Sequence, residues 1–190
     1  YYPLKPAFDT AFSRSDLLVE EVDMADMLAS DSQMEMLSRG MLPPGQSLEK
    51  LITPETYKAT ARKVEALGLP IEPLKRFKPW MLAITLQGME WQKAGFDADL
   101  GLDKHFYDKA KAAGKRVQGL ETLQYQISRF DEMPMDQQDR LLAETLKELD
   151  TTKEEFTKLA DAWQAGDAPQ VEKLALEDLR SEPAMYRRLL

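Results

Sequence analysis

Three acidic side chains, Glu21, Asp23 and Glu121, stand at the ends of two apolar segments of the chain. Residues 17–22 and 116–120 each predict a short strand, and sites in α/β proteins gather at the carboxyl ends of strands. If the strands are parallel neighbours, Glu21 and Glu121 lie close together. Asp23 follows Glu21 by two residues, so it shares the strand face of Glu21 and can join the cluster. Grouped carboxylates bind a hard cation or divide acid and base roles between them, because their repulsion raises one pKa.

A structural role for the same residues is the alternative. Each carboxylate can cap a neighbouring helix or pair with a basic side chain instead of serving a site. His105 is the only histidine, and a single histidine at a helix start is more often a surface or capping residue than a metal ligand. The chain has no cysteine, which excludes disulfides, thiolate nucleophiles and cysteine metal sites. It also has no glycine-rich phosphate loop and no nucleophile elbow.

The elements that must position these carboxylates are mostly helices. Residues 24–39 predict a methionine-rich helix that ends at Gly40, and Thr53 with Pro54 marks another helix start. Pro79 opens a helix with Trp80 and Trp91, whose spacing is typical of core packing. The fold class is therefore α/β and strongly helix-rich: a small central sheet with a large helical insertion at about residues 24–113, all in one domain spanning residues 1–190.

The charge balance limits the partners. The 190 residues include 25 basic and 33 acidic side chains, a net charge of −8, and no basic cluster large enough to bind a duplex. Nucleic acid and anionic membranes are therefore poor partners. No apolar run approaches the roughly eighteen residues of a membrane helix, so we expect no transmembrane segment. The hydrophobic content of 43% is enough for a true core.

Several short motifs occur in the order that is seen in TraB/GumN proteins. They are Leu17-Leu18-Val19-Glu20-Glu21-Val22-Asp23, Lys78-Pro79-Trp80, Gly101-Leu102-Asp103 and Gly114-Lys115-x-Val117-x-Gly119-Leu120-Glu121-Thr122, followed by Gln126 and Phe130. On these residues the chain resembles the TraB/GumN family, which includes bacterial pheromone-shutdown proteins and the animal TIKI metalloproteases. The similarity spans nearly the whole chain.

This resemblance implies an α/β fold and, in the TIKI-like branch, a metal-dependent peptidase with two Gly-x-x-His motifs. Glu21 falls on the acid of the family's first strand, and Glu121 falls on its Gly-Leu-Glu acid. The resemblance thus makes Glu21 and Glu121 candidate catalytic residues, and Glu21, Asp23 and Glu121 candidate ligands of Mn, Co or Zn. Neither Gly-x-x-His motif is in this chain. In the family one precedes the segment that matches Tyr1-Tyr2-Pro3, and the other follows a helix that matches residues 186–190.

We therefore expect the chain to be the interior of a longer protein, truncated at both ends. The leading hypothesis is a TraB/GumN-like domain whose full-length form is a metal-dependent, peptidase-like hydrolase with a peptide or protein substrate. The alternative is a peptide- or protein-binding module without catalytic activity, for which the methionines of residues 24–41 offer an adaptable surface. A haem-binding relative is a third reading, and it lacks an axial ligand beyond His105 and the methionines. The resemblance favours a periplasmic or secreted location in a bacterium.

Overall fold

The computed structural model describes residues 2–149 and 152–181, and these group into two compact units. The larger unit is Ser15–Leu149, and the smaller one combines the described parts of residues 1–14 and 150–190. Each unit has its own packing and is described by itself. None of the described helices is both long and apolar enough to cross a membrane.

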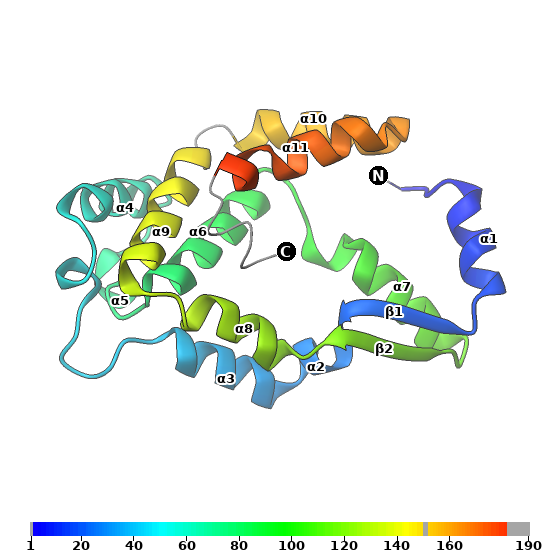
Figure 1. The fold of residues 1–190 in the computed structure, drawn as a ribbon, viewed down its shortest axis with the longest axis horizontal. Coiled ribbons are helices and arrows are strands. Elements are labelled where there is room, and N and C mark those ends of the chain that lie inside the picture. The colour runs from blue at the N-terminus through cyan, green and yellow to red at the C-terminus, as the bar shows by residue number, and fades with distance from the viewer. Residues whose placement is uncertain (1, 150–151, 182–190) are drawn as a thin grey trace. The chain divides into compact units, whose positions relative to one another are not determined.

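The sheet of the larger unit consists of β1 (Leu17–Val22) and β2 (Arg116–Glu121), which are parallel (Figure 1). This confirms the predicted pairing of the two segments. Parallel neighbours need a crossover connection, and here it runs through the helices between the strands. The helix-rich α/β class predicted from the sequence is also confirmed.

Eight α-helices accompany these strands in the described larger unit. They are α2 (Met24–Leu28), α3 (Ser30–Gly40), α4 (Pro54–Ala66), α5 (Ile71–Leu74), α6 (Pro79–Lys93), α7 (Leu102–Ala112), α8 (Leu123–Asp131) and α9 (Met135–Glu148). Helix α4 begins as predicted, because the Thr53 hydroxyl accepts a hydrogen bond from the Thr56 N–H at 3.3 Å and Pro54 occupies the first turn. Pro79 likewise opens α6.

The single helix predicted for residues 24–39 is wrong in one respect. It is broken at Ala29, whose backbone is extended with φ −64° and ψ 133°, so that α2 and α3 are separate helices. The break precedes Ser30-Asp31-Ser32, and such short polar side chains favour helix starts over helix interiors. Apolar periodicity continues across this break, which is why the pattern alone predicts one helix.

The main core of the larger unit lies between helices. Leu82 and Leu86 of α6 and Leu142 of α9 are completely buried, as are Val64 of α4 and Leu48 of the short 3-10 helix Leu48–Lys50. A helix that buries this many large apolar side chains gains its stability from packing rather than from intrinsic propensity. This helical layer stands beside the sheet and does not depend on the strands for its interior.

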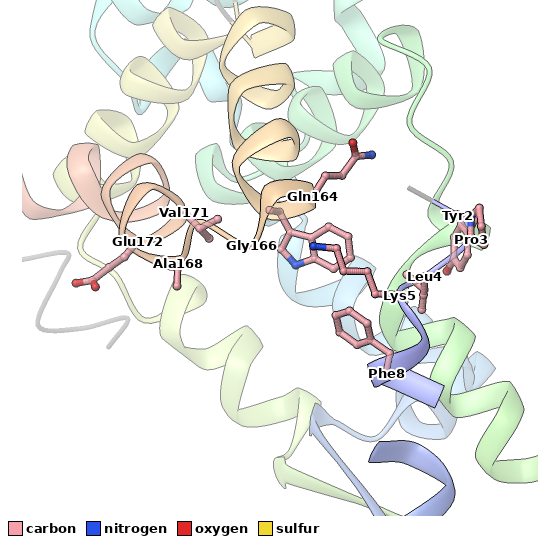
Figure 2. A pocket seen from close by; sticks show the side chains of 11 residues that line it. Tyr2, Pro3, Leu4, Lys5, Phe8, Gln164, Gly166, Ala168, Val171 and Glu172 are labelled. Carbon is pink, nitrogen blue, oxygen red and sulfur yellow. The ribbon is translucent and has the colours of Figure 1, made fainter. Parts of the chain in front are cut away.

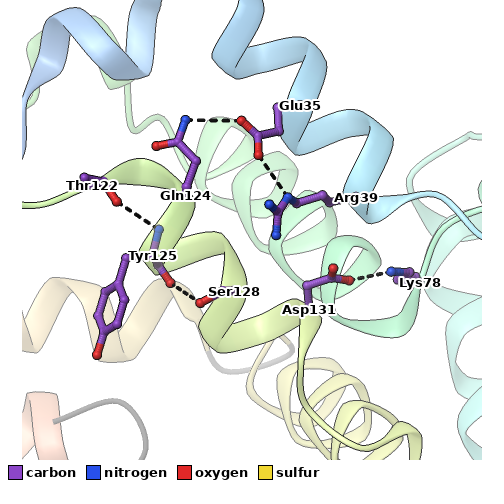
Figure 3. Close-up of polar contacts among 8 residues, drawn as sticks. All are labelled: Glu35, Arg39, Lys78, Thr122, Gln124, Tyr125, Ser128 and Asp131. Atoms are coloured by element: carbon purple, nitrogen blue, oxygen red, sulfur yellow. Dashed lines mark hydrogen bonds and ion pairs between the residues drawn. The ribbon is translucent and has the colours of Figure 1, made fainter.

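A second, smaller core connects the helices to the sheet. It consists of the buried residues Val22, Trp80, Met81, Leu123 and Ile127, which come from β1, α6 and α8. The two tryptophans of α6 differ, because Trp80 is completely buried and Trp91 is 38% exposed. An ion pair between the Lys78 Nζ and the Asp131 Oδ1 also joins the start of α6 to the end of α8 (Figure 3). Helices α6 and α8 thereby fix β1 from one side.

The smaller unit contains α1 (Pro6–Arg14), α10 (Thr152–Ala165) and α11 (Ala168–Ser181). Gly166, with φ +80°, separates α10 from α11. Phe8 of α1 packs against Trp163 of α10, with ring centroids 5.8 Å apart. The segment of residues 186–190 lies outside the described residues.

Candidate functional site

The carboxyl ends of β1 and β2 meet at one edge of the sheet. Val22 is the register partner of Glu121, and Asp23 follows β1 directly. The parallel pairing therefore brings the three predicted carboxylates to the same end of the sheet, as the sequence predicts for neighbouring parallel strands. Their exact arrangement then depends on which face each side chain occupies.

The register places Glu21 and Glu121 on opposite faces. Side chains alternate along a strand, and register partners in parallel strands share a face. Because Glu121 pairs with Val22, it shares the face of Val22 and Glu20, whereas Glu21 lies on the face of Leu120. Both Glu21 and Glu121 are exposed. The structure thus brings Glu21 and Glu121 to one end of the sheet without placing them side by side.

Glu20 is the acid that the register brings to the inner face. Its side chain belongs to a residue that is only 7% exposed, and its Oε2 accepts a hydrogen bond from the Met24 N–H at 3.1 Å. Its Oε1 is buried and has no hydrogen-bond partner among the described residues. Burial raises the pKa of Glu20, and the nearby carboxylates of Asp103 and Asp23 raise it further, while the hydrogen bond from Met24 lowers it. A buried carboxyl with an unpaired oxygen is costly, and such groups concentrate at functional sites.

Sequence reasoning missed Glu20 as a site residue, although a signal for it exists. The alternation of β1 places Leu18, Glu20 and Val22 on one face, so that Glu20 lies between two apolar residues. An acid between two apolar residues on the same strand face is a buried acid.

Asp23 has a structural role in addition to any chemical one. Its Oδ1 accepts a hydrogen bond from the Ala25 N–H at 2.9 Å and so caps α2. Asp23 is half-buried, and its other oxygen, Oδ2, does not take part in this hydrogen bond. This is the capping role that the sequence left open as an alternative, and it orients Asp23 beside Glu20.

Gly119 allows the two strand ends to approach each other. It is the register partner of Glu20. A Cβ atom at this position would lie 2.8 Å from the backbone N of Asp23 and 3.0 Å from the carbonyl O of Glu121. Since both neighbours are backbone atoms, a side chain here would push the ends of β1 and β2 apart. The glycine of the Gly119-Leu120-Glu121 segment therefore sets the geometry of the site.

These residues do not complete a metal centre. Within residues 2–149 and 152–181, no three histidine or carboxylate side chains are grouped closely enough to hold a metal ion. His105 lies on α7, half-buried, with its ring at 5.0 Å from that of Phe106. The available donors at the sheet edge are carboxylate oxygens, which suit hard cations better than zinc.

Two cavities of the described residues are alternative candidates for a site. One of about 800 Å³ lies in the smaller unit, where Leu4, Lys5, Phe8 and Val171 are among its lining residues (Figure 2). None of the strand-end carboxylates lines it.

The second cavity, of about 370 Å³, lies beside the sheet. Asp23 lines it together with Tyr107, Lys111, Lys115 and Arg116. The cationic lining was not predicted, because it comes from α7 and the start of β2, far from Asp23 in the sequence. An anionic group that enters this cavity would meet positive charge.

Comparison with known proteins identifies relatives of this chain. It is 26% identical over 161 residues to the uncharacterized protein YbaP of Escherichia coli (strain K12). The matched residues make up 85% of this chain and 58% of the relative. The YbaP protein of Shigella flexneri matches with the same identity and coverage. The chain thus spans somewhat more than half the length of these relatives. No solved structure matches it.

The match to a protein family covers more of the chain than these pairwise matches do. The TraB/PrgY/gumN family matches residues 1–190, the whole length of the chain. The motif order from Leu17 to Thr122 and the parallel pairing of the two motif-bearing strands agree with this match. The chain belongs to the TraB/PrgY/gumN family.

Proposed function

We propose that the full-length protein is a metal-dependent hydrolase that acts on peptide bonds, with its site at the carboxyl edge of β1 and β2. The observation that supports this proposal most directly is Glu20, a buried carboxyl with an unpaired Oε1 on the same sheet face as Glu121. Carboxylates in such environments serve as acids, bases or ligands in hydrolases. The resemblance to the TIKI-like branch supplies the reaction class.

The small sheet also supports a proposed site that is completed by additional strands of the full-length protein. Two-stranded parallel sheets are unusual, because parallel sheets normally have several strands with both faces covered. On the face that Glu21 occupies, Val19 is 48% exposed and Leu120 is 73% exposed. Within the described residues, β1 and β2 pair only with each other, so the outer edge of each strand can accept another strand. In the relatives the matched segment covers 58% of the length, and the remaining residues are enough for such strands.

We place Mn, Co or Zn in the full-length protein, with most of its ligands on the added segments. A bound divalent metal supplies a Lewis acid and a water of lowered pKa. In this arrangement Glu121 and Glu20 face the same side and contribute acid and base groups, while Asp23 holds the start of α2 beside them. Glu21, on the other face, contributes only through a segment that covers that face.

A peptide-cleavage assay with added Mn, Co or Zn, performed on both this chain and its full-length parent, tests the proposal. We expect metal-dependent cleavage by the parent, no cleavage by the 190-residue chain, and weak zinc binding by the chain in calorimetry. Glu121→Gln in the parent should abolish cleavage with little loss of folding stability. Glu132→Gln is the control, because Glu132 lies at the far end of α8 and its side chain is 63% exposed.

Two results would contradict the proposal. Cleavage or tight zinc binding by the 190-residue chain would show that the metal ligands are already present in it. An inactive parent that nevertheless binds peptides would favour the alternative function, a binding module in which the strand-end carboxylates are structural. The exposed apolar residues of α2 and α3 are the observation that favours this second function.

A further inference from the structure

Helices α2 and α3 expose an unusual number of large apolar side chains. Met27, Leu28, Met34 and Leu37 are 42%, 54%, 67% and 48% exposed. We call these four residues the α2–α3 face. Single exposed apolar residues are ordinary, whereas apolar residues that gather on one surface mark an interaction site.

The α2–α3 face points away from the core because the other side of α3 is fastened to it. Met34 and Leu37 are three residues apart and so share one side of the helix. Met36, on the opposite side, packs against the small core that contains Val22 and Trp80. At the end of α3, Gly40 is buried directly against Met81.

A polar contact fixes the same orientation. The Glu35 carboxylate accepts hydrogen bonds from the Arg39 Nε at 3.0 Å and from the Gln124 Nε2 of α8 at 3.2 Å (Figure 3). This contact holds α3 against α8. Helix α3 is therefore fastened to the core, and the exposure of Met34 and Leu37 is not the result of a loosely attached helix.

The segment that carries the α2–α3 face has charges of one sign. Residues 24–38 include Asp26, Asp31 and Glu35 and no basic residue. Glu35 is engaged with Arg39 and Gln124, whereas Asp26 and Asp31 are exposed beside the apolar residues. Cationic side chains on a partner would complement the exposed carboxylates of Asp26 and Asp31.

We propose that the α2–α3 face docks a cationic amphipathic helix of another protein. An apolar stripe on that helix would pack on the four exposed residues, and its lysine or arginine side chains would meet Asp26 and Asp31. Two of the four residues are methionines, whose flexible side chains adapt to partners of different shape. This interaction is separate from hydrolysis at the sheet edge and does not rest on that function.

A fluorescence anisotropy titration of the 190-residue chain tests the docking. The probe is a labelled helical peptide of about 18 residues, or five turns, with leucines on one side and lysines on the other. A peptide of the same composition in scrambled order, which has no apolar stripe, is the peptide control. We expect the ordered peptide to bind at least tenfold more tightly than the scrambled one.

Variants assign the binding to this surface. The double substitution Met34→Gln with Leu37→Gln should weaken binding about tenfold. Asp26→Asn with Asp31→Asn should weaken it about threefold and flatten its dependence on salt, because screened charges contribute less. Leu100→Gln is the matched control, since Leu100 is 62% exposed outside this face, and it should leave the affinity unchanged.

Three outcomes would overturn the proposal. Equal binding of the ordered and scrambled peptides would reduce the effect to nonspecific charge attraction. Unchanged affinity in the Met34→Gln, Leu37→Gln variant would place the peptide elsewhere. Self-association of the chain in sedimentation, abolished by that same variant, would show that the occupant is a second copy. Circular dichroism of each variant confirms that the helices remain folded.

Discussion

The helical layer and the sheet of the larger unit differ in how completely they bury their residues. In the helical layer, side chains such as Leu82, Leu86 and Leu142 are entirely buried between α4, α6 and α9. In the sheet, only Glu20 and Val22 are buried, and Leu120 is 73% exposed. The helices thus form a finished core, whereas the strands present an incomplete surface. We expect the stability of this unit to rest mainly on the helical layer, whereas the proposed site lies at the edge of the sheet.

The largest loss of stability is expected when a buried side chain of the helical layer is shortened. Leu82→Ala should lower the free energy of unfolding by about 3 kcal/mol, because it removes a completely buried side chain and leaves a cavity. Leu120→Ala on the exposed sheet face should change it by less than about 0.5 kcal/mol. Urea denaturation of both variants measures the difference. Equal losses would mean that the sheet is as well packed as the helices.

Two glycines differ in the space around them: Gly119 of the sheet is crowded by backbone atoms, whereas Gly88 of α6 is not. Gly119→Ala should destabilise the protein by about 1–3 kcal/mol, because its Cβ would lie 2.8 Å from the backbone N of Asp23. Gly88→Ala in α6 should stabilise it by up to about 1 kcal/mol, since nothing lies within 4 Å of a Cβ there. Thermal unfolding of the two variants should shift in opposite directions. A neutral Gly119→Ala would show that the strand ends separate easily.

The cap at the end of β1 should have a smaller effect. Asp23→Ala removes the hydrogen bond from the Ala25 N–H and should cost about 1 kcal/mol. Asp23→Asn keeps an acceptor oxygen and should retain most of the stability. Urea denaturation of the pair distinguishes capping from charge. An equal loss in both variants would indicate that the negative charge of Asp23, rather than its hydrogen bond, stabilises α2.

The smallest effect is expected for Glu20 and should appear as a dependence on pH. The pKa of Glu20 in the folded protein lies above its ordinary value of 4.5. The folded state therefore keeps this proton at pH values where the unfolded chain has released it, and stability falls as the pH rises from 4.5 through the raised pKa. Glu20→Gln removes this fall.

The measurement is the urea midpoint of the Glu20→Gln variant and of the original chain at pH 4 and at pH 7. We expect the variant to gain stability relative to the original chain between these two values. Glu21→Gln is the control, because Glu21 is the exposed neighbour on the other sheet face. A gain of the same size in the control would remove Glu20 as the cause.

The sequence predicted the elements better than the contacts between them. The apolar segments and the Thr53–Pro54 helix start depend on local chemistry, and the structure confirms them. The face of each strand-end acid depends on register, which is set by packing between residues far apart in the chain. A shift of one residue exchanges Glu20 and Glu21, so the residue pattern alone could not decide between them.

The exposure of individual residues was equally difficult to predict. Met34 and Met36 are two positions apart in one helix, and composition treats them alike, yet one is 67% exposed and the other packs on the small core. Only the placement of α8 beside α3 decides which side is inner. Trp80 and Trp91 likewise share a helix, and only Trp80 is completely buried.

The pairing of β1 with β2 also determines the order in which the larger unit can fold. Leu17 and Arg116 are register partners 99 positions apart (116 − 17). Closing a flexible loop of this length costs about 4 kcal/mol in chain entropy, before any strand contact compensates for it. Each of α4, α6 and α9 forms through contacts within itself, and α6 docks on α9 by closing a shorter loop than the strands do. We expect amides of these helices to gain protection from hydrogen exchange before those of β1 and β2, so that the candidate site is assembled last.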